Sequence, residues 1–210
     1  MLQEQIRNDI ANATVRLPRP EGLGVLVDNG VIITAAHCID FSCEGEMALG
    51  EYFIETIRTP NSECRLAVIA VEPVADIAAL SFHDDQPFST DELFLDYCRN
   101  TKPVPICQNN EANDFRVYIY THHSTWVTGL AKSNDNDGKL GIRADEPIIR
   151  GTSGGPVVNE KGELVGLVSS FSLVTEHLRE CTGQASRPHL ALPLRISNRI
   201  FADRDTYYDY

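Results

Sequence analysis

Residues 22–38 read GLGVLVDNGVIITAAHC, and this stretch decides the fold class. Two short runs rich in β-branched residues, 25–27 and 31–34, flank the turn sequence DNG. An Asn-Gly step between two such runs is a strong signal for a β-hairpin, because both residues tolerate the positive φ angles that tight turns require. We therefore expect two antiparallel strands, the second of which leads into a small-residue turn that carries His37.

Similar runs of strand length recur along the chain. Residues 156–158 and 164–168 flank a second turn, NEKG, whose glycine can take a positive φ angle. Further strands are expected at 13–17, 52–58, 66–71, 77–81, 116–121, 126–131, 140–144 and 189–194. Helical patterns are confined to the two ends, at 2–11 and 196–202. The sequence therefore predicts an all-β fold with short N- and C-terminal helices.

The charge balance and the N-terminal segment narrow the possible partners and locations. The 210 residues include 18 Lys and Arg against 30 Asp and Glu, a formal net charge of -12. Phosphate backbones and anionic membrane surfaces repel such a chain, so we expect no nucleic-acid partner and no membrane association. The N-terminal residues MLQEQIRNDI lack the basic and apolar blocks of a signal peptide, and no run reaches the ~18 apolar residues of a membrane helix. These features predict a cytoplasmic protein.

The cysteines are scattered and include no CxxC pair, which disfavours a zinc site. They are Cys38, Cys43, Cys64, Cys98, Cys107 and Cys181. Without an export signal, free thiols in a reducing compartment are the expectation. We expect no metal and no cofactor.

The hexapeptide GTSGGP at 151–156 carries the strongest chemical signal. Glycines on both sides of Ser153 allow a tight turn that exposes its hydroxyl. The amides of Gly151 and Ser153 can then converge on one point, as donors to the oxygen of a tetrahedral intermediate. The pattern indicates a nucleophilic serine beside an oxyanion hole.

A serine nucleophile needs a base to take its proton and a carboxylate to orient that base. His37 is the candidate base. Asp76, in VADIAALSF, is the candidate carboxylate, because it lies in an apolar segment where an unpaired charge would be costly. Other acids in polar stretches are interpreted as solvated loop charges; these are Asp84, Asp85, Asp91 and Asp96.

The segments ITAAHC, DIAAL and GTSGGP, in this order, resemble the chymotrypsin-like serine proteases, and the style of ADEPIIRGTSGGP is closest to the bacterial HtrA/Deg-type catalytic domain. The resemblance implies two packed six-stranded antiparallel β-barrels in one peptidase domain. The expected parts are a first barrel at about 13–97, a linker at about 98–113, a second barrel at about 114–195 and a C-terminal helix at about 196–202. It also implies that RPHLALPLRISNRIF contains the last strand and the closing helix.

The resemblance assigns roles to four residues. His37 is implied to be the general base, Asp76 its orienting partner and Ser153 the nucleophile of a serine endopeptidase. Ser169 falls where the family has a serine that supports the aspartate and whose backbone pairs with the substrate. The partner implied is a peptide or protein substrate.

This sequence departs from the family pattern in ways that bear on activation. Thr152 stands where trypsin-type enzymes have Asp, and no IVGG start is present, so activation by clipping is not expected. The enzyme is expected either to fold active or to be controlled by a regulatory protein partner. Gly22 stands near the position of the cysteine that usually faces Cys38, so that family disulfide is missing. No PDZ domain is expected.

Two interpretations of the specificity for the substrate side chain remain open. Pro147 occupies the place of the acid that selects basic residues, and Ile148 and Phe171 suggest an apolar pocket for small or medium side chains. Alternatively, His189 aligns with a pocket-floor glycine and could pair with an acidic side chain of the substrate. Arg150 is either a solvated charge at the rim of the cleft or a substrate contact.

Adjacent His122 and His123, in YTHHSTW, would point to opposite faces of a strand, so a shared metal is not expected and both are interpreted as exposed turn residues. Two other classes of function remain open. One is a catalytically silent peptide-binding module on the same fold, and the other is an esterase with the same triad.

Overall fold

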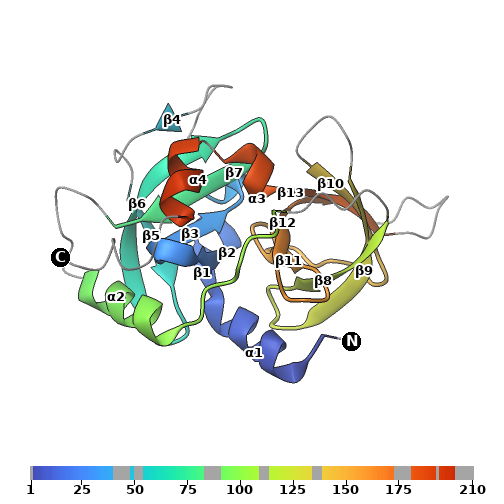
Figure 1. Cartoon of the computed structure of the whole chain (residues 1–210), viewed down its shortest axis with the longest axis horizontal. Coiled ribbons are helices and arrows are strands. Elements are labelled where there is room, and N and C mark those ends of the chain that lie inside the picture. The colour runs from blue at the N-terminus through green and yellow to red at the C-terminus, as the bar shows by residue number, and fades with distance from the viewer. Residues whose placement is uncertain are drawn as a thin grey trace.

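The computed structural model describes most of the chain. The described residues are 2–39, 48–49, 54–82, 91–108, 114–133, 139–172, 181–192 and 194–201. They form two β-barrels side by side, with short helices packed around the outside (Figure 1).

The first barrel comes from the N-terminal half of the chain. Its strands are β1 (Thr14–Pro18), β2 (Glu21–Val27), β3 (Val31–Thr34), β4 (Ala48–Leu49), β5 (Ile54–Arg58), β6 (Glu63–Glu72) and β7 (Ile77–Ser81). The pairing order is β4-β6-β5-β1-β2-β3-β7, and β6 also pairs with β7. Six strands thus close into a ring, and the two-residue strand β4 is added outside it on β6.

The second barrel follows the same plan. Its strands are β8 (Phe115–Tyr120), β9 (Trp126–Ser133), β10 (Lys139–Ala144), β11 (Pro156–Val158), β12 (Leu164–Ser172) and β13 (Cys181–Ser186). They close in the order β10-β13-β12-β11-β8-β9, each pair antiparallel. The two closed barrels confirm the predicted fold class.

The predicted hairpin is formed by β2 and β3. Val27 pairs with Val31, and the turn residues Asn29 and Gly30 have φ angles of 59° and 65°. Asn and Gly are the residues that adopt this left-handed region at least cost, which explains the turn at this point. The chain leaves β3 into a short 3-10 turn, Ala36–Cys38, that carries His37.

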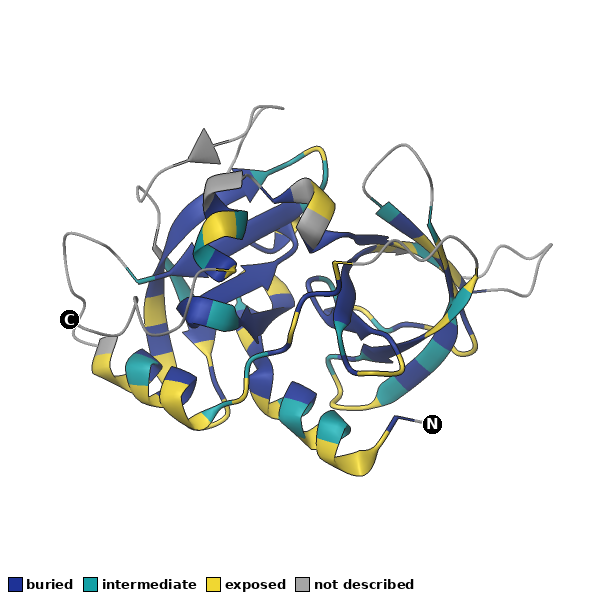
Figure 2. Ribbon diagram, viewed as in Figure 1, coloured by how far each residue is buried: buried dark blue, intermediate teal, exposed yellow. Residues whose placement is uncertain are grey.

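Each barrel has its own hydrophobic core. One cluster of buried side chains fills the first barrel and extends under the helices, and a second fills the other barrel. Strands β2, β3, β6 and β7 of the first barrel are buried along most of their length, whereas β9 and β10 of the second barrel alternate between buried and more exposed residues, and the helices present exposed residues outward (Figure 2). His37, Asp76 and Ser153 lie on turns at the ends of strands of these two barrels.

Four helices complete the described structure: α1 (Glu4–Ala13), α2 (Asp91–Asn100), α3 (Pro188–Ala191) and α4 (Leu194–Ile200). Helix α4 returns to the first barrel, where Asn29 Nδ2 donates to the carbonyls of Arg199 at 2.9 Å and Ile200 at 3.1 Å. Among the described residues, no helix is long and apolar enough to cross a membrane.

Two predictions about these elements are wrong. Helix α2 lies in the middle of the chain, although we expected helices only at its two ends, and the strand expected at 189–194 is instead the helical turn α3 followed by the start of α4. Pro188 stands at the first turn of α3, where its fixed φ angle favours a helix start and its missing N–H is no loss. The last strand of the second barrel is β13, which comes earlier in the chain.

Candidate active site

His37 and Asp76 come from two turns of the first barrel and are in direct contact. His37 Nδ1 lies 2.9 Å from Asp76 Oδ2 and 3.0 Å from Oδ1, and the His37 backbone amide donates to Oδ1 at 3.1 Å. Asp76 ends the β6–β7 turn with a φ angle of 57°, a left-handed conformation that Asp tolerates better than most residues. The side chain of His37 is 49% exposed and that of Asp76 only 16%, so the ring faces outward while the carboxylate is held beneath it.

The contact shifts the pKa of both groups. The hydrogen bond to Asp76, together with one to the neighbouring Cys38, raises the pKa of His37 from 6.5 to about 10. Burial by itself would raise the pKa of Asp76, but the hydrogen bonds from His37 and Ser169 outweigh it and hold that pKa below its ordinary value. Asp76 therefore remains a carboxylate and stabilises the charged form of the ring.

Two serines of the second barrel hold the Asp76 turn in place. Ser169, in β12, donates to Asp76 Oδ2 at 2.5 Å. Ser186, at the end of β13, donates to the carbonyl of Ala75. The sequence pattern indicated Ser169 through the family resemblance but gave no signal for Ser186, which ends a strand of small and polar residues.

Ser153 lies in the turn before β11, and two glycines give that turn its shape. Gly151 and Gly154 have φ angles of 83° and 75°, which side chains rarely adopt. Space excludes a side chain as well, because a Cβ on Gly154 would lie 2.0 Å from the Leu23 carbonyl. The close fit sets the partly exposed serine against the first barrel, where the Leu23 amide donates to its carbonyl at 2.8 Å.

The amides of this turn divide into two groups. Gly154 N–H donates to the Val168 carbonyl at 2.7 Å, and Gly155 N–H donates to the Thr152 carbonyl at 2.8 Å. Within the described part of the chain, the amides of Gly151 and Ser153 donate to no carbonyl. These are the two donors expected to form an oxyanion hole.

The turn of Ser153 packs close to His37 across the junction of the barrels. A Cβ on Gly154 would lie 3.0 Å from the amide nitrogen of Ala35, two residues before His37. A Cβ on Gly22 would lie 2.5 Å from Cys38 Sγ and 3.1 Å from the Ser153 carbonyl. Among the described residues, no hydrogen bond joins the Ser153 hydroxyl to His37, and such bonds commonly tighten only when substrate binds.

The residues considered for specificity are spread over different environments. Pro147 and Arg150 are exposed, whereas Ile148 is 7% exposed and belongs to the core cluster of the second barrel. Phe171 lies in β12 and His189 in α3, and both side chains are outside the described part of the structure. The expected strand around His189 is helical in the structure, and the interpretation of His189 as a pocket-floor residue stays a prediction.

His122 differs from the expectation of an exposed turn residue. Its side chain is only 16% exposed and lies 3.1 Å from Glu21 Oε1 through Nε2, whereas His123 is exposed. No group of His, Cys, Asp and Glu among the described residues could hold a metal ion. The sequence therefore did not reveal that the side chain of His122 is mostly buried and lies beside Glu21.

Two barrels that bring a histidine–aspartate pair beside a glycine-bounded serine turn define a serine hydrolase site. Residues 22–167 match the family model of the trypsin-like peptidase domain. The chain belongs to this family of serine peptidases.

Curated relatives are serine proteases. Serine protease HTRA2, mitochondrial, of Bos taurus is 28% identical over 185 residues, which covers 78% of this chain and 36% of that protein. Serine protease HTRA1 of Xenopus laevis is 25% identical over 209 residues, which covers 86% of this chain and 41% of that protein. The chain thus spans well under half the length of these relatives.

Solved structures share the fold at low sequence identity. The Rv3671c protease of M. tuberculosis in its active form has a TM-score of 0.57 and 17% identity, covering 87% of this chain and 78% of that chain. The serine protease of human pathogenic astrovirus has a TM-score of 0.53 and 18% identity, covering 84% of this chain and 90% of that chain. Both likenesses concern the fold alone.

Proposed function

We propose that this domain is an active serine endopeptidase in which His37, Asp76 and Ser153 form the catalytic triad. The observation that carries the proposal is the His37–Asp76 contact at 2.9 Å, supported by Ser169 and placed at the same barrel junction as the serine turn. The same geometry favours an enzyme over a silent binding module, because Asp76 accepts hydrogen bonds from His37 and Ser169 beneath an exposed imidazole, as the carboxylate that orients a general base does.

The proposed reaction proceeds through an acyl-enzyme. Ser153 Oγ attacks the carbonyl carbon of the peptide bond while His37 Nε2 accepts the hydroxyl proton, and Asp76 stabilises the resulting imidazolium. The amides of Gly151 and Ser153 donate to the carbonyl oxygen as it becomes negative. His37 then gives the proton to the departing amine, and the C–N bond breaks. Water attacks the ester in the same manner, its proton passes to His37, and Ser153 is regenerated when that proton returns to Oγ.

For substrate preference we propose peptide bonds after small or medium apolar residues. Pro147 supports this, because it supplies no charge where selection of basic side chains would need one. Cleavage of a peptide library, read by mass spectrometry, tests this preference. Cleavage mainly after Lys, Arg, Asp or Glu would contradict it.

The physiological setting is also a proposal. We propose a reducing, cytoplasmic compartment, a peptide or protein substrate and control by a regulatory protein partner. The five cysteines that the structure describes lie buried, which suits thiols that stay reduced; they are Cys38, Cys64, Cys98, Cys107 and Cys181. Titration of free thiols in denaturant, with and without reductant, tests the redox state, and a lower count without reductant would contradict it.

Fluorophosphonate labelling of the wild type beside Ser153→Ala tests the catalytic proposal without a chosen substrate. We expect one adduct on the wild type, located at Ser153 by peptide mapping, and none on the variant. An unlabelled wild type that still binds peptides would instead indicate a silent module. Labelling without release of fragments from casein would favour the esterase.

A further inference from the structure

A network of side chains reaches the turn of Gly151 from the first barrel. Arg16 of β1 donates through Nη2 to the His122 carbonyl at 2.9 Å, and Glu21 of β2 lies 3.1 Å from His122 Nε2. The turn between β8 and β9, which carries His122, is thereby attached to the opposite barrel. The ring is mostly enclosed, whereas the Glu21 side chain is 60% exposed.

His122 in turn contacts both residues that precede Ser153. A Cβ on Gly151 would lie 3.1 Å from His122 Cγ and 3.2 Å from Nδ1, so the ring packs directly against the glycine backbone. The His122 amide donates to Thr152 Oγ1 at 3.2 Å, and Thr152 is 1% exposed. One residue therefore restrains the peptide unit that supplies the Gly151 amide.

Such a restraint matters because glycine is free to rotate. With no side chain, Gly151 can leave its φ angle of 83° at little steric cost, and a rotated peptide would point its N–H away from the reacting carbonyl. Removal of one oxyanion-hole donor costs about 10²–10³ in rate. The imidazole is held in one orientation, because its Nε2 lies 3.3 Å from Arg16 Nη1 and 3.1 Å from Glu21 Oε1, and the ring then limits how the glycine can turn.

We propose that His122, held by Glu21 and Arg16, is a positioning residue that keeps the Gly151 amide directed into the oxyanion hole. The inference rests on the proposed triad and oxyanion hole, which it deepens by naming what orients one of the two donors. His122 itself does not touch the substrate carbonyl.

The test compares His122→Leu with His122→Gln. Leucine keeps bulk but loses the link to Glu21, whereas the amide of glutamine reaches the position of Nε2 and keeps it. The readout is fluorophosphonate labelling of Ser153, separated into the maximal rate constant kinact and the half-saturating concentration KI. For His122→Leu we expect kinact to fall by about 10- to 100-fold with KI little changed. His122→Gln is expected to restore kinact to within about threefold of the wild type.

Two further variants keep the result decisive. His123→Leu alters the exposed neighbour and is expected to label like the wild type. Glu21→Ala removes the partner from an exposed position, does not threaten folding, and is expected to lower kinact in the same direction. Equal kinact in His122→Leu and the wild type, or equal losses in His122→Leu and His123→Leu, would overturn the inference while the catalytic proposal stands. An unlabelled wild type would instead overturn the catalytic proposal, and this inference with it.

Discussion

Asp76 accepts hydrogen bonds from His37 and Ser169 while its own backbone occupies the left-handed region. Because its pKa is lower in the folded than in the unfolded chain, folding gains stability above the ordinary value of 3.8. That gain disappears as pH falls through the folded value. The Asp76 carboxylate thus contributes to the pH dependence of the free energy of unfolding and also stabilises the protonated form of His37.

The pH dependence of activity follows from the shifted pKa of His37. The base must be neutral to accept a proton, so activity rises as pH passes upward through the pKa of the free enzyme. Because Asp76 stabilises the imidazolium, kcat/KM is expected to have its inflection above pH 6.5, in the direction of the shifted value of about 10. Asp76→Asn is expected to move the inflection to lower pH and to reduce kcat by about 10⁴. A wild-type inflection at or below pH 6.5 would contradict this account.

Ser169→Ala removes the serine that supports Asp76. Hydrogen bonds to charged groups are worth about 1.5–3 kcal/mol, so we expect kcat to fall by about tenfold or more as the carboxylate loses its orientation. Ser170 is the matched control, since it is the adjacent residue of β12 but is exposed. Peptidase assays on both variants check the prediction, and equal activities would show that Asp76 does not need this support.

At the scale of elements, the serine turn depends on its fit between the two barrels. Gly154→Ala places a Cβ 2.0 Å from a backbone carbonyl at a positive φ angle. The Leu23 backbone cannot move aside without disturbing strand β2. We therefore expect the free energy of unfolding to fall by more than about 4 kcal/mol and the activity to be lost. Gly141→Ala is the control, because its nearest atom, the Lys132 carbonyl oxygen, lies 3.9 Å away. Thermal unfolding measures both, and a Gly154→Ala melting curve like that of Gly141→Ala would contradict the packing argument.

The strands could be predicted because local signals agree with the tertiary fold. The β2–β3 hairpin carries its own turn chemistry, and its strands are apolar where the barrel buries them. Strand β13 was not predicted because its residues, CTGQAS, are small and polar, and half of them are not buried. Helix α2 was not predicted because the sequence around it is polar. Phe94, Tyr97 and Cys98 nevertheless recur at helical spacing and are buried.

The candidate site was predictable where a short motif carries its chemistry. The glycines around Ser153 and the buried setting of Asp76 are visible in the sequence, and the structure places His37 against Asp76. Contacts between residues that are far apart in the sequence produce no comparable motif. His122 and Glu21 are 101 positions apart, and nothing in either neighbourhood indicates that the barrels bring them within 3.1 Å.

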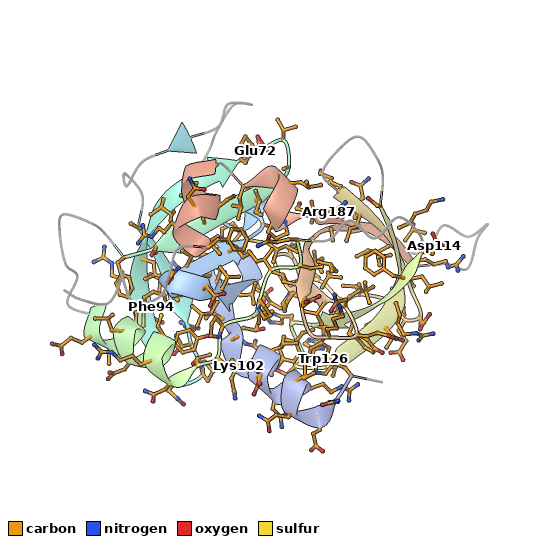
Figure 3. All side chains as sticks on the ribbon, in the orientation of Figure 1. Glu72, Phe94, Lys102, Asp114, Trp126 and Arg187 are labelled. Atoms are coloured by element: carbon orange, nitrogen blue, oxygen red, sulfur yellow. The ribbon has the colours of Figure 1, made fainter. Side chains whose placement is uncertain are left out.

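At the scale of the whole molecule, α1 connects the two barrels. Ile6 packs against Gly162 in the β11–β12 turn, and Arg7 lies over the ring of Trp126 at 5.8 Å. On the other side, Asp9 pairs with Lys102 at 3.2 Å, and Figure 3 shows Lys102 and Trp126 on either side of this helix. The helix therefore contributes to the stability of the whole domain.

Ile10 is the buried anchor of that helix, at 2% exposure in the core of the first barrel. Ile10→Ala leaves a cavity and is expected to lower the free energy of unfolding by about 2–5 kcal/mol. Asn8→Ala, on the exposed face of the same helix, is expected to change it by less than about 0.5 kcal/mol. Urea unfolding followed by circular dichroism distinguishes the two, and equal midpoints would mean that α1 is not held by its core contacts.

The position of α1 has a consequence for biosynthesis. A ribosome makes this helix before every partner it uses, and the partner latest in the chain, Gly162, follows both Trp126 and Lys102. A helix of 10 residues is marginal in water without tertiary contacts. The nascent helix therefore gains its contacts in two stages: those of Ile10 need only the strands of the first barrel, whereas those with Trp126 and Gly162 need the second barrel, which is translated later.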